Sequence, residues 1–135
     1  LGSGTGEGFV LLSARSGRRW RVIQSDQDCH YGHIFQAVEV VWAPSVEARK
    51  ERGYFAIKEI DVNLFMENVH ANENPFKEIS ALQHLMAYGP HPNVIELTEV
   101  LRYENHIYMI FPYCDGGELF KVVTTTSSRR LSEAR

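Results

Sequence analysis

The sequence predicts an α+β fold, a five-stranded antiparallel sheet with one long helix packed against it. Five segments are rich in β-branched and aromatic residues, and polar segments separate them. One amphipathic helical segment is inserted between the third and the fourth of these strands. The third strand, residues 54–60, contains a lysine, Lys58, on the strand face that also carries Ala56 and Ile60.

The first two strands are expected to form a hairpin. Residues 20–24 and 34–42 have strand character, and the polar residues 25–33 between them indicate a turn. Residues 43–53 contain a proline and four charged side chains, which predicts an exposed connection to the third strand. Ahead of the hairpin, the glycine-rich residues 1–8 predict a flexible linker. Residues 9–19 fit either a lead-in strand or an extension.

The long helix is predicted to begin at Asn74 and Pro75. Asparagine is a preferred helix cap, and proline is favoured at the first helical position. Apolar residues at 76, 79, 82 and 85–86 then recur at helical spacing. Gly89, followed by Pro90, ends the helix at about residue 88. Residues 61–73, just before it, predict a turn and a short helix.

The rest of the chain predicts two more strands and two helical segments. Residues 94–102 and 107–111 have strand character, with Glu104 and Asn105 as the turn between them. Residues 116–123 predict a short helix, residues 124–130 a polar connection, and residues 131–135 the start of another helix.

Lys58 needs a partner, because an ammonium group on a half-buried strand face is costly unless it is paired. Glu78, near the start of the long helix, is the expected one. We predict that the two side chains face each other across the gap between strand and helix.

Size and charge limit the possible functions. The 135 residues suit one small domain or part of a larger one, and 44% apolar residues allow a core. A net charge of -3 gives no general argument for nucleic-acid binding, and no apolar run suggests a membrane span. Cys29 and Cys114 show no disulfide or metal spacing, and none of the six histidines shows metal spacing. Reduced thiols and a cytoplasmic location are therefore expected, without a metal site.

Five segments, in this order, resemble the serine/threonine protein-kinase family. They are Gly32-His33-Ile34-Phe35, Phe55-Ala56-Ile57-Lys58, Glu78-Ile79, and the stretches 91–97 and 107–120. The lysine strand and the helix glutamate belong to the kinase signature set. The resemblance covers residues 20–135. It implies a kinase N-terminal lobe at 20–111 and a hinge, a short helix and the start of the C-terminal lobe at 112–135, with residues 1–19 as a flexible or extension segment.

The resemblance also implies a site for ATP and Mg²⁺. Lys58 would hold the α- and β-phosphates, and Glu78 would orient it. Gly32 would end the phosphate loop, and Ile34 and Ala56 would enclose the adenine. Phe111 would be the gatekeeper; the carbonyl of Pro112 and the backbone of Cys114 would bind the adenine edge, and Glu118 the ribose. Magnesium ligands and the catalytic base are expected in the C-terminal lobe, which the kinase needs as a partner to phosphorylate hydroxyls of protein substrates; the chain as given is expected to be inactive.

The phosphate loop departs from the family pattern. Gln27 and Cys29 stand where its first and second glycines are expected, and Asp26 and Asp28 add carboxylates where a triphosphate would lie. Three interpretations therefore stand: part of an active kinase, a pseudokinase that binds or scaffolds, and an unrelated α/β interaction domain.

Two further expectations follow from the kinase alignment. Leu82, Leu97 and the residues after Gly117 are expected to leave an uncovered apolar patch. Cys29 is expected on an exposed turn, and Cys114 is expected to be partly shielded and less reactive.

Overall fold

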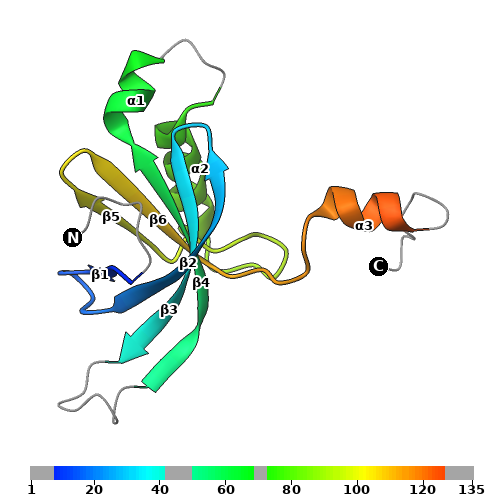
Figure 1. Ribbon diagram of the computed structural model, residues 1–135, viewed down its shortest axis with the longest axis horizontal. Coiled ribbons are helices and arrows are strands. Elements are labelled where there is room, and N and C mark those ends of the chain that lie inside the picture. Colours follow the sequence, from blue (N-terminus) through cyan, green and yellow to red (C-terminus); the bar gives the residue numbers. More distant parts are fainter. Residues whose placement is uncertain (1–7, 42–49, 69–72, 127–135) are drawn as a thin grey trace.

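The computed structural model describes residues 8–41, 50–68 and 73–126, and it confirms the α+β class (Figure 1). Its antiparallel sheet has six strands in the order β1-β2-β3-β4-β6-β5. The strands are β1 (Val10–Leu12), β2 (Arg19–Cys29), β3 (Gly32–Val41), β4 (Lys50–Asp61), β5 (Glu99–Tyr103) and β6 (His106–Pro112). The strand beyond the predicted five is β1, from the segment that fitted either a lead-in strand or an extension.

Three helices complete the described part of the chain: α1 (Val62–Glu67), α2 (Pro75–Met86) and α3 (Leu119–Thr125). The start of α2 is confirmed, because the Asn74 side chain accepts hydrogen bonds from the backbone N–H groups of Phe76 at 3.0 Å and Lys77 at 3.3 Å. The helix ends two residues before the predicted position. Gly89 follows with φ of 90°, a left-handed conformation that glycine adopts without strain.

The β2–β3 hairpin is longer than predicted. Only His30 and Tyr31 form its turn, so the prediction of a turn over residues 25–33 is wrong. The polar side chains of residues 24–28 are exposed, and they keep their hydration while the backbone continues to pair. Two register shifts, between Val22 and Gln24 and between Ser25 and Gln27, interrupt this pairing.

The strand predicted over residues 94–102 is also shorter than expected, since β5 begins at Glu99. Within the preceding apolar stretch Leu97 is buried, whereas Ile95 is 47% exposed, so the stretch lacks the alternation of a strand. The backbone N–H of Thr98 still donates to the Ile110 carbonyl at 2.8 Å. The turn at Glu104 and Asn105 is confirmed.

The core has two layers, one on each face of the sheet. One layer consists of Leu11, Trp20, Val22, Phe35, Ala37, Ile57, Tyr108 and Ile110. The other contains residues of α1 and α2, and consists of Tyr31, Ile60, Phe65, Ile79, Leu97, Ile107, Met109 and Phe111. Alternation along β4 and β6 sorts side chains between the layers, so Lys58 lies on the face that also packs against α2.

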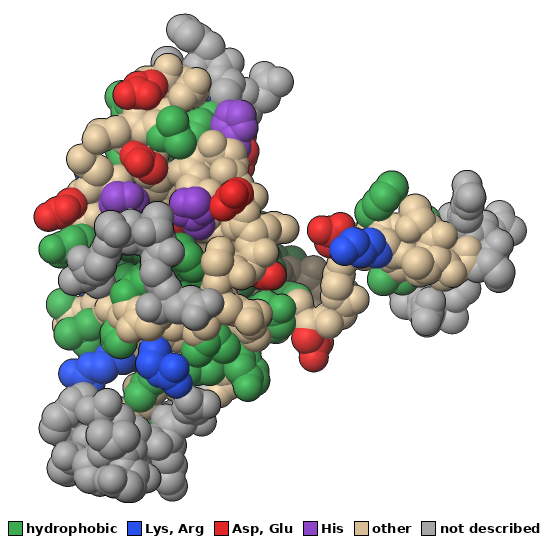
Figure 2. Space-filling model, in the orientation of Figure 1, with side chains coloured by type: hydrophobic (Ala, Val, Ile, Leu, Met, Phe, Trp, Pro, Cys, Tyr) green, Lys and Arg blue, Asp and Glu red, His purple; other side chains and the backbone are tan. Residues whose placement is uncertain are grey.

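The expected apolar patch is only partly present. Leu97 is 9% exposed and packs in the core, so its predicted exposure is wrong; the segment 94–98 turns its side chain inward against α2 and β6 residues. Leu119 and Phe120 are 66% and 74% exposed, as predicted for residues after Gly117. Their helix, α3, stands clear of the sheet (Figures 1 and 2).

Parts of the predicted linker at 1–8, of the connections at 43–53 and 124–130, and the whole helix start at 131–135 lie outside the described residues. No helix in the described part of the chain is long and apolar enough to cross a membrane.

Candidate functional site

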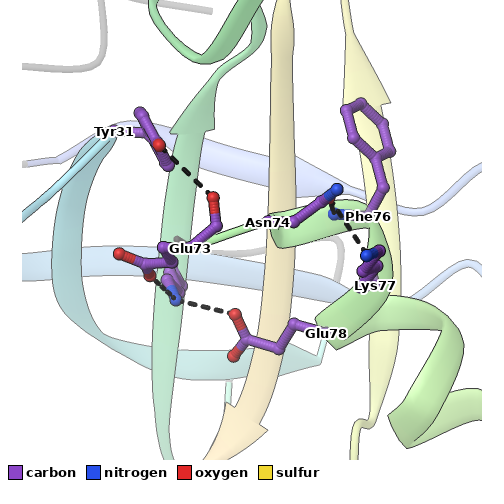
Figure 3. A network of polar contacts seen from close by, with 7 residues as sticks. Tyr31, Glu73, Asn74, Phe76, Lys77 and Glu78 are labelled. Carbon is purple, nitrogen blue, oxygen red and sulfur yellow. Dashed lines mark hydrogen bonds and ion pairs between the residues drawn. The ribbon is translucent and has the colours of Figure 1, made fainter. Parts of the chain in front are cut away.

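The predicted pairing of Lys58 with Glu78 is confirmed (Figure 3). The Lys58 ammonium Nζ lies 2.9 Å from Glu78 Oε2. Strand β4 presents Lys58, whose side chain is 17% exposed, and the first turn of α2 presents Glu78. The Asn74 cap fixes where that turn begins, so a local sequence signal sets the position of the carboxylate.

A second carboxylate also reaches Lys58. Glu73 Oε1, on the segment before α2, lies 3.5 Å from Lys58 Nζ. Burial lowers the pKa of Lys58, but the hydrogen bond and the charge of Glu78, together with the charge of Glu73, outweigh it and raise the pKa above its usual value. The ammonium therefore stays charged at neutral pH and offers a fixed cation on the sheet.

Apolar side chains surround this cation on the same face of the sheet. Ile34 of β3 is paired with Lys58, and Met109 of β6 is paired with it on the other side. Ala56, two residues before Lys58, is paired with Phe111. Directly paired residues share a face, so the structure brings Ile34, Ala56, Lys58 and Phe111 together. Phe111 is buried and Ala56 is half-buried.

The other predicted nucleotide-binding residues lie where the chain leaves the sheet. Pro112 is the last residue of β6, and its carbonyl oxygen lies 3.9 Å from the Cys114 Sγ. Cys114 is exposed, so its predicted shielding is wrong, because the chain turns away from the sheet at this point (Figure 1). Glu118 is exposed at the start of α3.

Gly32 is required by packing against β4. A Cβ at this position would lie 2.0 Å from the Glu59 carbonyl oxygen and 2.9 Å from its carbon. Both atoms belong to the backbone of β4 and cannot rotate away. The structure thus gives Gly32 a role in sheet packing that is independent of any phosphate.

Tyr31, beside Gly32 at the tip of the hairpin, is 2% exposed. Its ring lies edge-on to Phe65 at 5.3 Å, and its hydroxyl donates to the backbone carbonyl of Glu73 at 3.3 Å. Its own carbonyl accepts from the backbone N–H of Asp61 at 2.7 Å. Sequence reasoning missed both Tyr31 and Glu73. An aromatic residue inside a polar turn was the available signal for Tyr31; Glu73 had none.

The acidic residues of the hairpin are turned to solvent. Asp28 is 84% exposed in its side chain, and its Oδ1 lies 2.6 Å from His33 Nδ1. Cys29 is half-buried rather than on an exposed turn, so that expectation is wrong. Burial raises the pKa of the Cys29 thiol, although the nearby charge of Lys58 lowers it. Within the described residues, no cluster of His, Cys, Asp or Glu could hold a metal ion.

Comparison with known proteins identifies the family. The family model described as "Protein kinase domain" matches residues 43–135. The chain belongs to the protein kinase family. The kinase signature residues Lys58 and Glu78 lie within the matched range, as do Ala56, Phe111 and the segment that leads to α3. The first strands of this kinase chain, including Gly32 and Ile34, precede that range.

Curated relatives of this kinase chain are serine/threonine kinases. CBL-interacting serine/threonine-protein kinase 2 of Arabidopsis thaliana is 43% identical over 68 residues, which are 50% of this chain and 14% of that protein. Serine/threonine-protein kinase KIN4 of Saccharomyces cerevisiae is 30% identical over 100 residues, covering 74% of this chain and 12% of that protein. CBL-interacting protein kinase 9 of Oryza sativa is 36% identical over 80 residues, 59% of this chain and 16% of that protein. The chain therefore spans less than a fifth of these relatives.

Proposed function

We propose that this chain is the ATP-binding N-terminal lobe of a serine/threonine protein kinase that transfers the γ-phosphate of ATP to hydroxyl groups of proteins. The observation that carries the proposal is the ion pair between Lys58 and Glu78 on a sheet face bordered by Ile34, Ala56 and Phe111. Phosphoryl transfer is catalysed mainly by positioning and charge stabilisation, and an oriented cation beside an apolar slot can provide both.

Each residue has a defined part in this proposal. Lys58 donates hydrogen bonds to the α- and β-phosphates while Glu78 holds its ammonium in place. Ile34 and Ala56 enclose the flat adenine ring, and Phe111 closes the back of the slot. The Pro112 carbonyl and the backbone of Cys114 bind the adenine edge. Proline serves there because the position offers only its carbonyl.

The remaining roles concern the outer parts of the nucleotide. Glu118 accepts a hydrogen bond from the ribose, which requires the segment before α3 to lie close to the slot. The backbone at Gly32 covers the phosphates. Mg²⁺, when bound, neutralises phosphate charge; its ligands are proposed to come from the C-terminal lobe, as is the catalytic base. Protein substrates and a cytoplasmic location belong to the same proposal.

Nucleotide binding can be tested by NMR titration of the ¹⁵N-labelled chain with Mg-ATP, which also reports whether each variant is folded. Lys58→Met is expected to weaken binding at least about tenfold, because it removes a charge-assisted contact to phosphate. Lys77→Met is the matched control, since Lys77 is an exposed lysine on the first turn of α2. A folded wild-type chain whose spectrum does not change at millimolar Mg-ATP would refute the proposal.

A second candidate function is that of a pseudokinase, a binding or scaffolding module with the kinase fold. The hairpin favours it. Gln27 and Cys29 carry side chains where the family has phosphate-loop glycines, and Tyr31 is buried at the tip. In the same titration this candidate predicts no response of Lys58 or its strand neighbours to Mg-ATP.

A further inference from the structure

Lys58 is held by more negative charge than its kinase role requires. Glu78 at 2.9 Å is fixed by the first turn of α2, whereas Glu73 at 3.5 Å lies outside the helix. The Glu73 side chain is 46% exposed and can swing into water, but Lys58 is only 17% exposed and has little open surface. A phosphate that reaches the Lys58 ammonium therefore competes with the Glu73 carboxylate for the same donors.

Tyr31 ties the hairpin tip to the segment that carries this carboxylate (Figure 3). Its hydroxyl donates to the Glu73 backbone carbonyl, and its ring packs on Phe65, whose ring in turn lies 5.4 Å from Phe76 of α2. Burial of a tyrosine side chain contributes on the scale of a core residue, so this anchor is firm. The tip and Glu73 are thus held together on one side of Lys58.

The hairpin also comes close to Lys58 itself. The charge of Lys58 acts on the Cys29 thiol, and Cys29 is half-buried. The backbone at the tip is fixed to β4 by the hydrogen bond from Asp61 to the Tyr31 carbonyl. In this arrangement the hairpin, Glu73 and Lys58 form one connected unit.

We propose that Glu73 and Tyr31 form an autoinhibitory latch, in which the Glu73 carboxylate occupies the phosphate position at Lys58 and Tyr31 holds it there. The latch rests on the proposed function for its biological meaning. Triphosphate binding displaces Glu73 into solvent and leaves the Lys58–Glu78 pair intact. Glu73 thereby sets the affinity for phosphate groups and leaves the adenine slot unaffected.

The test compares Glu73→Gln with Glu67→Gln, which makes the same change of charge at an exposed position of α1. Three probes are titrated: inorganic tripolyphosphate, Mg-ATP and adenosine. Removing a carboxylate next to a phosphate site is expected to tighten tripolyphosphate and Mg-ATP binding about three- to tenfold, given partial solvent screening. Adenosine affinity is expected to stay within about twofold, because adenosine carries no charge for the carboxylate to repel. Glu67→Gln is expected to change none of the three.

Tyr31→Phe tests the second half of the latch, with Tyr88→Phe as its control. Tyr88 is 81% exposed, so losing its hydroxyl leaves the fold unchanged. Tyr31→Phe keeps the ring packing and removes the hydrogen bond to Glu73. It is expected to tighten tripolyphosphate binding by a smaller factor than Glu73→Gln. The double variant is expected to match Glu73→Gln alone, because the hydroxyl acts through Glu73.

Each result separates the latch from nucleotide binding. Unchanged or weaker tripolyphosphate binding in Glu73→Gln overturns the latch, whether or not wild-type protein binds Mg-ATP. Tighter tripolyphosphate binding that Lys58→Met abolishes supports the latch even where Mg-ATP and adenosine fail to bind. That combination refutes the proposed nucleotide function alone. An equal gain in Glu67→Gln also overturns the latch, since it shows a general effect of net charge.

Discussion

Gly32→Ala tests the packing of the hairpin on β4 most directly. The added Cβ would meet the Glu59 carbonyl oxygen at 2.0 Å, whereas carbon–oxygen contacts in proteins begin at about 3.3 Å. The two strands must therefore separate by roughly 1 Å at this point. That movement strains the pairing of Gly32 with Ile60 and the Asp61–Tyr31 backbone hydrogen bond. Hydrogen bonds contribute about 1 kcal/mol each and overpacking costs about 1–3 kcal/mol, so a loss of about 2–4 kcal/mol is expected.

This loss can be measured by urea denaturation followed by circular dichroism. The matched control is Gly116→Ala, because a Cβ at Gly116 meets nothing within 4 Å. We expect the control to lie within about 0.5 kcal/mol of wild type, as surface substitutions usually do. If Gly32→Ala loses less than about 1 kcal/mol, the strands accommodate a side chain and the packing argument for Gly32 is refuted.

Three further predictions concern single side chains. Burial raises the pKa of Glu59 despite a hydrogen bond from Tyr108, so the folded state binds a proton more readily than the unfolded state. Stability therefore falls as the pH rises from the unfolded pKa near 4.5 through the raised folded pKa, and Glu59→Gln should remove this fall and be more stable than wild type at pH 7; urea denaturation at pH 4 and pH 7 decides, and the same pH dependence in both proteins would contradict it. Asn74→Ala removes the α2 cap and should cost about 1 kcal/mol in thermal denaturation, with no measurable loss counting against the cap. Cys114 should be alkylated faster than Cys29, because Cys114 is exposed and burial raises the Cys29 pKa; mass spectrometry of both peptides at pH 7.5 would reveal equal or reversed rates.

The sequence predicted those features that local patterns and simple charge arguments determine. The cap at Asn74, the turn at Glu104 and the alternation along β4 each depend on a few neighbouring residues. The Lys58–Glu78 pair was predictable because a half-buried ammonium needs a partner and few carboxylates lie on the adjoining helix. These features supply the α+β class and the centre of the candidate site.

What the sequence left open depends on contacts between distant segments. The short strand β1 is fixed by pairing with β2 and by Ser16, which follows it and donates to Glu99 Oε2 at 3.0 Å across 83 positions of the chain. Glu73 reaches Lys58 only after the hairpin tip and the approach to α2 have packed together. No periodicity marks such a residue. The direction in which Tyr31 turns is likewise decided by Phe65 and Ile60 on other elements.

The glycine pattern of the hairpin and the burial of Tyr31 have the same structural cause. Gln27 and Cys29 occupy positions where β2 still pairs with β3, opposite Ile34 and Gly32, and a paired strand accepts side chains. Glycine remains only at position 32, where β4 leaves no room for a Cβ. The hairpin is therefore a paired ribbon up to its two-residue turn and lacks the flexibility that glycines give a phosphate loop. Bending that opens it over Lys58 is expected at the two register shifts between residues 22 and 27, where the pairing is already interrupted. Hydrogen exchange with and without tripolyphosphate would locate this bending; a change confined to residues 29–32 would show that the tip itself opens.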